Sequence, residues 1–161
     1  MENDKKTFFL YPGQLVVFKE PSNIMTILGS CVAVCLWDIK LRFGGMNHYL
    51  LPLWKVQGLR TPKFGNVAIE ILIEEMLKNG SSSKNLVAKV FGGAKVLNTS
   101  DDSLFNIGKK NSEIAFDLLQ QYNINVTAES IGGINGRKIL FNTNTGEVLM
   151  KIIDKTFVNP E

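Results

Sequence analysis

Three side chains limit the chemistry open to this sequence of 161 residues: one histidine, His48, and two cysteines, Cys31 and Cys35. A thiol can act as a nucleophile, and an imidazole can act as its general base or acid. A single histidine excludes His-x-x-x-His zinc sites, Cys₂His₂ fingers and multi-histidine metal centres, and two cysteines exclude a Cys₄ ribbon. The candidate chemistry is therefore that of a thiol and an imidazole.

The spacing of Cys31 and His48 is compatible with a β-hairpin that brings them together. If the polar stretch around Ile39 and Lys40 closes the hairpin, residues whose numbers sum to 79 lie opposite each other, which pairs Cys31 with His48. Directly opposed residues have Cβ atoms about 4.5–5.5 Å apart, so an imidazole nitrogen could reach the thiol sulfur. A bulge at the glycine pair 44–45 would slip this register and turn His48 to the other face.

The two cysteines have different surroundings. Cys31 follows Gly29 and Ser30, where a flexible turn enters an apolar strand, so its thiol can be partly exposed and the N–H groups of the turn can point at a developing oxyanion. With His48 nearby, we expect the pKa of Cys31 to fall below the free value of about 8.5. Cys35 lies about 13 Å further along the strand, too far for a disulfide or a shared metal, and we expect it to pack as a small apolar residue.

A purely structural role for these residues stays open at this point. A cysteine in an apolar strand is usually part of the core, and a lone histidine is usually a satisfied structural residue. The glycine pairs at 44–45, 92–93 and 132–133 match neither a Gly-x-Gly-x-x-Gly pattern nor a P-loop, so turns, bulges or close backbone contacts explain them better than phosphate binding.

The composition indicates an ordinary globular protein, with 45% hydrophobic and 20% charged residues. A net charge of +3, with basic residues only in short pairs, argues against nucleic acid as a partner. The N-terminus lacks the apolar segment of a secretion signal, and the longest apolar stretch, 27–37, is too short to span a bilayer. We therefore expect a cytoplasmic protein without membrane insertion, in which both cysteines are free thiols.

The elements that position these residues are predicted to form a single domain over residues 1–161 of the α+β class, with mixed sheets and helices covering one side. Apolar residues at helical spacing predict helices over 66–78 and about 108–122. Segments 79–85 and 98–103 are rich in small polar residues and are predicted to be loops. Strands are predicted over 30–37, 46–51, 86–91 and 127–131, followed by a hairpin of 138–141 and 147–152 around the loop 142–146.

Several segments, in order along nearly the whole chain, resemble the CheD family of chemoreceptor glutamine deamidases. The two that contain the cysteine and the histidine are 28–36 (LGSCVAVCL) and 44–52 (GGMNHYLLP). The others are 64–69 (FGNVAI), 89–94 (KVFGGA), 106–111 (NIGKKN), 131–133 (IGG) and 136–138 (GRK).

This resemblance implies a layered cysteine-hydrolase fold, with helices packed on two mixed β-sheets. It also implies an activity, the hydrolysis of selected glutamine side-chain amides on bacterial chemoreceptors to glutamate, and it implies no metal or organic cofactor. The implied partners are the methyl-accepting chemotaxis receptors, as substrate, and a CheC-type phosphatase.

By the same resemblance the nucleophile falls on Cys31, the general base on His48 and a third, orienting residue on Thr26. Ser30, Gly29 and Asn47 are competing orienting residues or oxyanion donors. Two other functions remain open: a non-catalytic chemotaxis module that binds receptor helices and a CheC-type phosphatase, and a cysteine peptidase or transglutaminase-like enzyme that uses the same pair.

Overall fold

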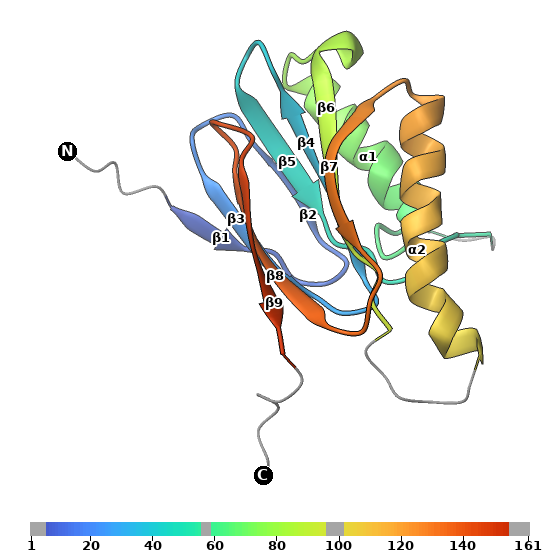
Figure 1. The fold of residues 1–161 in the computed structure, drawn as a ribbon. Coiled ribbons are helices and arrows are strands. Elements are labelled where there is room, and N and C mark those ends of the chain that lie inside the picture. Colours follow the sequence, from blue (N-terminus) through green and yellow to red (C-terminus); the bar gives the residue numbers. More distant parts are fainter. Residues whose placement is uncertain (1–5, 56–58, 96–101, 155–161) are drawn as a thin grey trace.

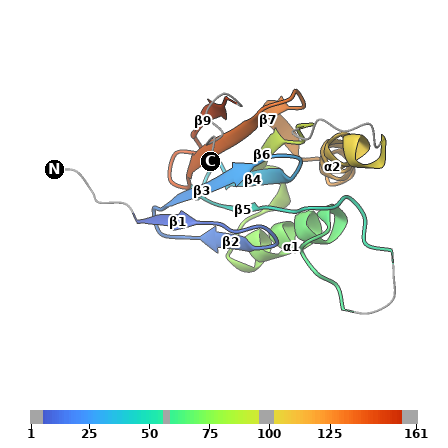
Figure 2. The same cartoon turned by 90° about the horizontal axis from the view of Figure 1, so that it is seen from below.

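A five-stranded β-sheet lies between a four-stranded sheet on one side and two helices on the other (Figures 1 and 2). This computed structural model describes residues 6–55, 59–95 and 102–154, with residues 102–105 described by their backbone alone. The four-stranded sheet has the order β1 (Thr7–Phe9), β3 (Asn23–Leu28), β8 (Gly136–Asn142), β9 (Val148–Ile153). The five-stranded sheet has the order β2 (Leu15–Phe18), β5 (Phe43–Asn47), β4 (Val32–Asp38), β6 (Leu86–Gly92), β7 (Asn125–Ile131).

Both sheets are mixed, which confirms the predicted α+β architecture of helices and two mixed sheets. The pairs β1–β3 and β6–β7 are parallel, and the other neighbouring strands are antiparallel. The helices, α1 (Gly65–Lys78) and α2 (Asp102–Gln121), pack against each other and against the five-stranded sheet, and a short 3₁₀ helix (Ser83–Asn85) precedes β6. None of the helices in the described part of the chain is long and apolar enough to cross a membrane.

Helix α1 matches the predicted helix 66–78 because its apolar residues recur on one face. Ile69, Leu72 and Met76 are fully buried against the sheet. The helix ends at Lys78, where the side-chain amide of Asn79 donates to the carbonyl of Glu75 (2.8 Å). The backbone of the following glycine takes a positive φ, as at many helix C-termini.

Helix α2 begins earlier than predicted, at Asp102 rather than Gly108. The predicted loop 98–103 is therefore wrong at residues 102 and 103, and its remainder lies outside the described residues. Gly108 is not a helix start but a contact point inside the helix: a Cβ there would lie 2.6 Å from the carbonyl oxygen of Gly93. A glycine inside a helix is tolerated where another backbone approaches this closely.

Each of the six predicted strands overlaps an observed strand, β4 to β9, and the C-terminal hairpin is confirmed. The strand predicted at 46–51 is displaced, since β5 covers Phe43–Asn47 and the chain beyond it makes only isolated bridges. Three N-terminal strands were not predicted. β1 and β2 have three and four residues, and the buried positions of β3 alternate Ile24, Thr26 and Leu28, so a polar residue interrupts the apolar pattern.

The predicted register of the β4–β5 hairpin is wrong by two. Observed partners sum to 81, as in Cys35 with Met46 and Asp38 with Phe43. The reason is a four-residue turn: the Asp38 carboxylate accepts hydrogen bonds from the N–H groups of Lys40 and Leu41, both at 2.8 Å, and the Asp38 carbonyl accepts one from the Arg42 N–H at 2.9 Å. A longer loop moves every pair of the hairpin by the same amount.

Two apolar clusters fill the spaces between the three layers. One lies between the helices and the five-stranded sheet and includes Val34, Leu72 and Leu119. The other lies between the two sheets and includes Leu28, Cys35 and Phe141. Cys35 is buried, as predicted, and neither cysteine forms a disulfide.

Candidate active site

Thr26 and His48 meet between the two sheets. Thr26 projects from β3 of the four-stranded sheet, His48 directly follows β5 of the five-stranded sheet, and the hydroxyl oxygen of Thr26 lies 2.7 Å from Nδ1 of His48. The same hydroxyl donates its only hydrogen to the carbonyl oxygen of Leu10, at 2.7 Å. Thr26 must therefore accept from an Nδ1–H group, which leaves the lone pair of His48 on Nε2.

The Nε2 atom of His48 is buried and has no hydrogen-bond partner among the described residues. The backbone fixes the residue on both sides, because its N–H donates to the Gln14 carbonyl (3.1 Å) and its carbonyl accepts from the Gly13 N–H (2.7 Å). Burial lowers the pKa of His48 to about 4, so the ring is neutral at pH 7. A neutral, oriented imidazole with a lone pair that no described residue occupies has the protonation state in which it can accept a proton.

Cys31 lies where the chain crosses from one sheet to the other, between the end of β3 and the start of β4. Its half-buried side chain packs against the apolar cluster between the sheets. Because the bridge of Val32 with Tyr49 also sums to 81, His48 is opposite Ala33 and diagonal to Cys31. A register shift of two leaves the side chains of Cys31 and His48 on the same face. Diagonal neighbours of this kind are about 7–8 Å apart.

The thiol and the imidazole are not joined by a hydrogen bond, since Nε2 has no partner among the described residues. Burial raises the pKa of Cys31 above its ordinary value, and the opposing effect of its own backbone N–H is smaller. The expected fall of this pKa is therefore wrong for the free protein. Both groups are therefore neutral at pH 7 and do not form a thiolate–imidazolium pair in the free protein.

The end of β6 and the two residues after it hold the backbone of the crossover between β3 and β4. The carbonyl of Gly29 accepts from the N–H of Ala94 (3.0 Å), and the carbonyl of Cys31 accepts from the N–H of Gly93 (2.9 Å). Gly92 and Gly93 have positive φ values of 116° and 70°, and a Cβ on Gly92 would overlap the Cys31 carbonyl. The glycine pair 92–93 therefore serves close backbone contact, as predicted.

The remaining candidates differ in position. Asn47 accepts the N–H of Val34 with its side-chain oxygen (2.8 Å), and by strand alternation it points to the opposite face from His48. Its amide nitrogen is buried without a partner among the described residues. Ser30 takes part through its carbonyl, which accepts from the side-chain amide of Asn111 in α2 (3.0 Å).

Two further groups at this site, the carbonyl of Leu10 and the side chain of Asn111, are not predicted from the sequence. Asn111 is fully buried, and its amide also donates to the carbonyl of Leu50 (2.9 Å). One signal could have indicated it: Asn111 lies at the helical spacing of four from Ala115 and of eight from Leu119, which places an amide on the apolar face of the helix.

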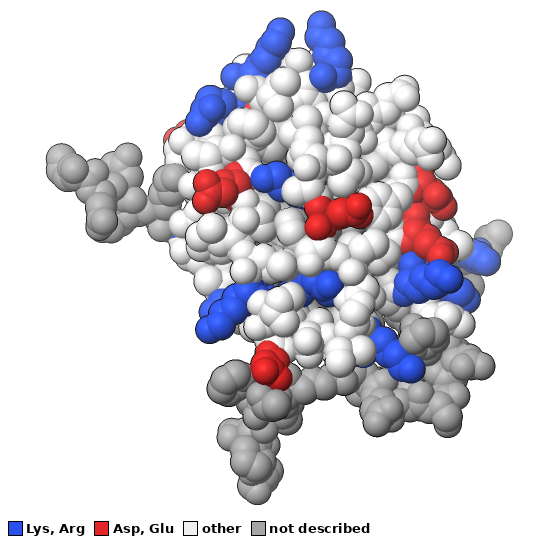
Figure 3. Space-filling model, in the orientation of Figure 1, with Lys and Arg blue, Asp and Glu red and all other residues white. Residues whose placement is uncertain are grey.

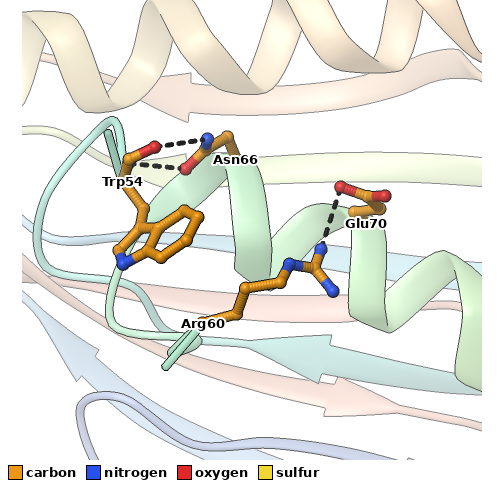
Figure 4. Close-up of polar contacts among 4 residues, drawn as sticks. All are labelled: Trp54, Arg60, Asn66 and Glu70. Atoms are coloured by element: carbon orange, nitrogen blue, oxygen red, sulfur yellow. Dashed lines mark hydrogen bonds and ion pairs between the residues drawn. The ribbon is translucent and has the colours of Figure 1, made fainter. Parts of the chain in front are cut away.

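The segment after His48 is fastened to α1 (Figure 4). The side chain of Asn66 accepts from the N–H of Trp54 (2.8 Å) and donates to its carbonyl (3.3 Å). Arg60 forms an ion pair with Glu70 at 3.0 Å, in which both side chains are more than two-fifths exposed. An exposed pair of this kind contributes little, so the segment is held by the Asn66 side chain together with the backbone N–H groups of Gly65 and Asn66, which donate to the carbonyls of Leu51 (2.7 Å) and Pro52 (3.1 Å).

A cavity lies near the site. A cavity of about 360 Å³ lies beside Gly93, between Ser112 and Phe116 of α2 and the end of β7 with the two glycines that follow it. Within the described ranges no three His, Cys, Asp or Glu side chains gather as metal ligands would. On the face drawn in Figure 3, basic side chains lie in several separate groups with acidic ones between them.

Comparison with known proteins decides the family. Residues 50–152 match the family model described as CheD chemotactic sensory transduction. The chain belongs to the CheD family. Two CheD relatives named "Probable chemoreceptor glutamine deamidase CheD" are similar along most of their length. The one from Sulfurimonas denitrificans is 47% identical over 97% of this chain and 99% of its own, and the one from Trichlorobacter lovleyi is 50% identical over 90% and 89%.

A third CheD relative, from Anaeromyxobacter dehalogenans, carries the name "Probable chemoreceptor glutamine deamidase CheD 1" and is 44% identical over 86% of this chain and 80% of its own. Among solved structures, the chain is similar to the Bacillus licheniformis hypothetical protein YfiH, with 15% identity and a TM-score of 0.46 over 71% of this chain and 49% of that one. That likeness is too slight to bear on the CheD fold.

Proposed function

We propose that this CheD-family chain is a protein-glutamine deamidase, which hydrolyses glutamine side chains of chemoreceptors to glutamate and releases ammonia. The names of its relatives support the reaction and the substrate. The observation that carries the mechanism is the bond of Thr26 to Nδ1 of His48, which leaves Nε2 without a partner in the described part of the chain, on the face that also bears Cys31.

The first half-reaction forms a thioester. Nε2 of His48 takes the proton of the Cys31 thiol as the sulfur attacks the side-chain carbonyl carbon of the glutamine. The carbonyl oxygen becomes an oxyanion, and the protonated Nε2 then gives its proton to the amide nitrogen, which leaves as ammonia. Thr26 keeps the Nδ1–H oriented through both transfers and stabilises the imidazolium that forms between them.

The second half-reaction consumes water. Nε2 of His48 takes a proton from a water molecule, whose oxygen attacks the thioester carbonyl. The carbon–sulfur bond breaks, the thiolate of Cys31 recovers the proton from His48, and the receptor residue is released as glutamate. One imidazole serves both steps, so the reaction needs no metal or organic cofactor.

The product adds a negative charge to a receptor helix, a local electrostatic change that can bias a two-state signalling element. The resemblance described above supports a cytoplasmic location and a CheC-type phosphatase as a second partner. Binding of that phosphatase over the site would couple deamidation to the state of the chemotaxis pathway.

The two cysteines offer a matched test of this proposal. Purified receptor is incubated with the wild-type protein, with Cys31→Ala or with Cys35→Ala, and its peptides are analysed by mass spectrometry for conversion of glutamine to glutamate. We expect Cys31→Ala to lower the rate at least about 10³-fold. We expect Cys35→Ala to keep the wild-type rate, because the Cys35 side chain is buried in the core between the sheets.

Full activity in Cys31→Ala would contradict the proposed mechanism. A wild-type protein that binds receptor without converting any glutamine would favour the non-catalytic chemotaxis module. Cleavage of the receptor backbone, or incorporation of an added amine without glutamate formation, would favour the peptidase or transglutaminase-like alternative.

A further inference from the structure

Asn111 joins the two segments of the chain that hold the nucleophile and the base. From the middle of α2, its buried amide nitrogen donates to the carbonyl of Ser30 (3.0 Å), next to Cys31, and to that of Leu50 (2.9 Å), two residues after His48. The backbone carbonyl of Asn111 accepts a hydrogen bond from the hydroxyl of Tyr49 (2.6 Å). One residue of the helix thus holds both segments, just before β4 and just after β5, from the side away from the four-stranded sheet.

The bond to Ser30 sets the direction of the Cys31 N–H. A trans peptide is planar, and its C=O and N–H point in opposite directions. Since the Ser30 carbonyl points at Asn111, the N–H of Cys31 points away from α2. No acceptor for this N–H occurs among residues 6–55, 59–95 and 102–154 apart from the thiol of Cys31 itself.

We infer that Asn111 is a positioning residue of the deamidation reaction: it holds the Ser30–Cys31 peptide so that the free N–H of Cys31 donates to the oxyanion. This inference rests on the proposed function and specifies how that site stabilises its transition state. The oxyanion forms on the carbon that the sulfur attacks, so a donor on the nucleophile's own backbone, beside the sulfur, is suitably placed.

Two reactions of the same thiol separate this role from a merely structural one. Deamidation uses the thiol, the base and the oxyanion donor. Alkylation by iodoacetamide is a direct displacement that forms no oxyanion, so it reports only on the state and exposure of the thiol. A positioning residue for the oxyanion donor should therefore affect the first reaction and spare the second.

The test compares wild type with Asn111→Ala in both reactions. We expect kcat for receptor deamidation to fall by about 10²-fold, since loss of one oxyanion donor costs 10²–10³. We expect KM and the rate of Cys31 alkylation to stay within about threefold of wild type. An unchanged kcat, or an alkylation rate that falls in parallel with kcat, would overturn the inference.

Two further variants complete the design. Asn111→Leu fills a similar volume without a donor and gives the same comparison if Asn111→Ala does not fold. Asn79→Ala is the matched control, because it also removes an amide that donates to a backbone carbonyl, that of Glu75 at 2.8 Å, at the end of α1; we expect wild-type kcat. A wild type that converts no glutamine would refute the proposed function and this inference with it, whereas an active wild type matched by Asn111→Ala would refute the inference alone.

Discussion

Among the described residues, His48 has a hydrogen-bond partner at Nδ1 and none at Nε2, and this asymmetry determines what the ring can do. Because the Thr26 hydroxyl donates to Leu10, it can only accept from Nδ1, so the proton of the neutral ring is located by two hydrogen bonds. Cys31 is neutral as well, because burial raises its pKa. The pair therefore resembles a base-assisted nucleophile more than a preformed thiolate–imidazolium pair.

Replacing Thr26 tests the orientation of the imidazole. Thr26→Val keeps the shape but removes the acceptor of the Nδ1–H, so the ring loses its fixed tautomer. We expect kcat for receptor deamidation to fall at least about 10-fold. Thr26→Ser keeps the hydroxyl and should stay within about threefold of wild type. Equal rates for the valine and serine variants would show that Thr26 does not orient His48.

The lowered pKa of His48 also predicts a pH dependence of stability. The ring has a pKa of about 4 in the folded protein and about 6.5 in the unfolded chain, so below pH 6.5 the unfolded state binds more protons. Stability is lost as the pH falls from about 6.5 to about 4, and the loss at pH 5 is about 2 kcal/mol.

Urea unfolding at pH 7 and pH 5 measures this effect. The decrease in unfolding free energy should be about 2 kcal/mol smaller in His48→Gln than in wild type. No other histidine contributes, because the sequence contains one. The same decrease in both proteins would mean that His48 is not held neutral by the fold.

At the scale of elements, the relative position of Cys31 and His48 depends on the length of the turn between β4 and β5. The sequence predicts the β4–β5 hairpin and places Cys31 and His48 on one face of it, but it does not predict the four-residue turn that Asp38 caps, and the register is off by two. The start of α2 was also misplaced, because Gly108 indicates a helix end when its contact with Gly93 is unknown. Helix periodicity and strand composition repeat along a segment, whereas the Asp38 turn depends on a single side chain and the Gly93–Gly108 contact joins two separate segments.

The loop of Gly93 provides a prediction at this scale. Gly93 and Gly133 have nearly equal positive φ values, 70° and 73°, so an alanine strains both backbones alike. A Cβ on Gly93 would also overlap the Ser112 hydroxyl and lie 2.7 Å from the carbonyl oxygen of Gly108, whereas no atom of the described residues lies within 4 Å of one on Gly133.

We therefore expect Gly93→Ala to lower the unfolding free energy by roughly 1–3 kcal/mol more than Gly133→Ala. It should also lower kcat, because the Gly93 N–H holds the Cys31 carbonyl. Urea unfolding and receptor deamidation measure the two effects. If the two variants are equally stable and equally active, the close packing of this loop does not matter to the site.

At the scale of the whole molecule, the site is assembled from both sheets and one helix. Thr26 comes from the four-stranded sheet, His48 from the five-stranded sheet, Cys31 from the connection between them and Asn111 from α2. The α+β class and the C-terminal hairpin could be predicted from the sequence, because they follow from local periodicity. The meeting of Thr26 with His48 was implied by the family resemblance alone, because β3 has a polar residue at a buried position and the packing of two sheets leaves no local pattern.

The most direct test of the central claim is to trap the thioester with hydroxylamine during receptor deamidation. Hydroxylamine attacks a thioester in place of water, which releases the thiol and leaves a hydroxamate on the receptor residue. With wild-type protein, mass spectrometry should find hydroxamate at the same receptor positions that otherwise become glutamate, and Cys31→Ala should give neither product. Glutamate formation by the wild type without hydroxamate at any hydroxylamine concentration, or by Cys31→Ala at the wild-type rate, would contradict a Cys31 thioester.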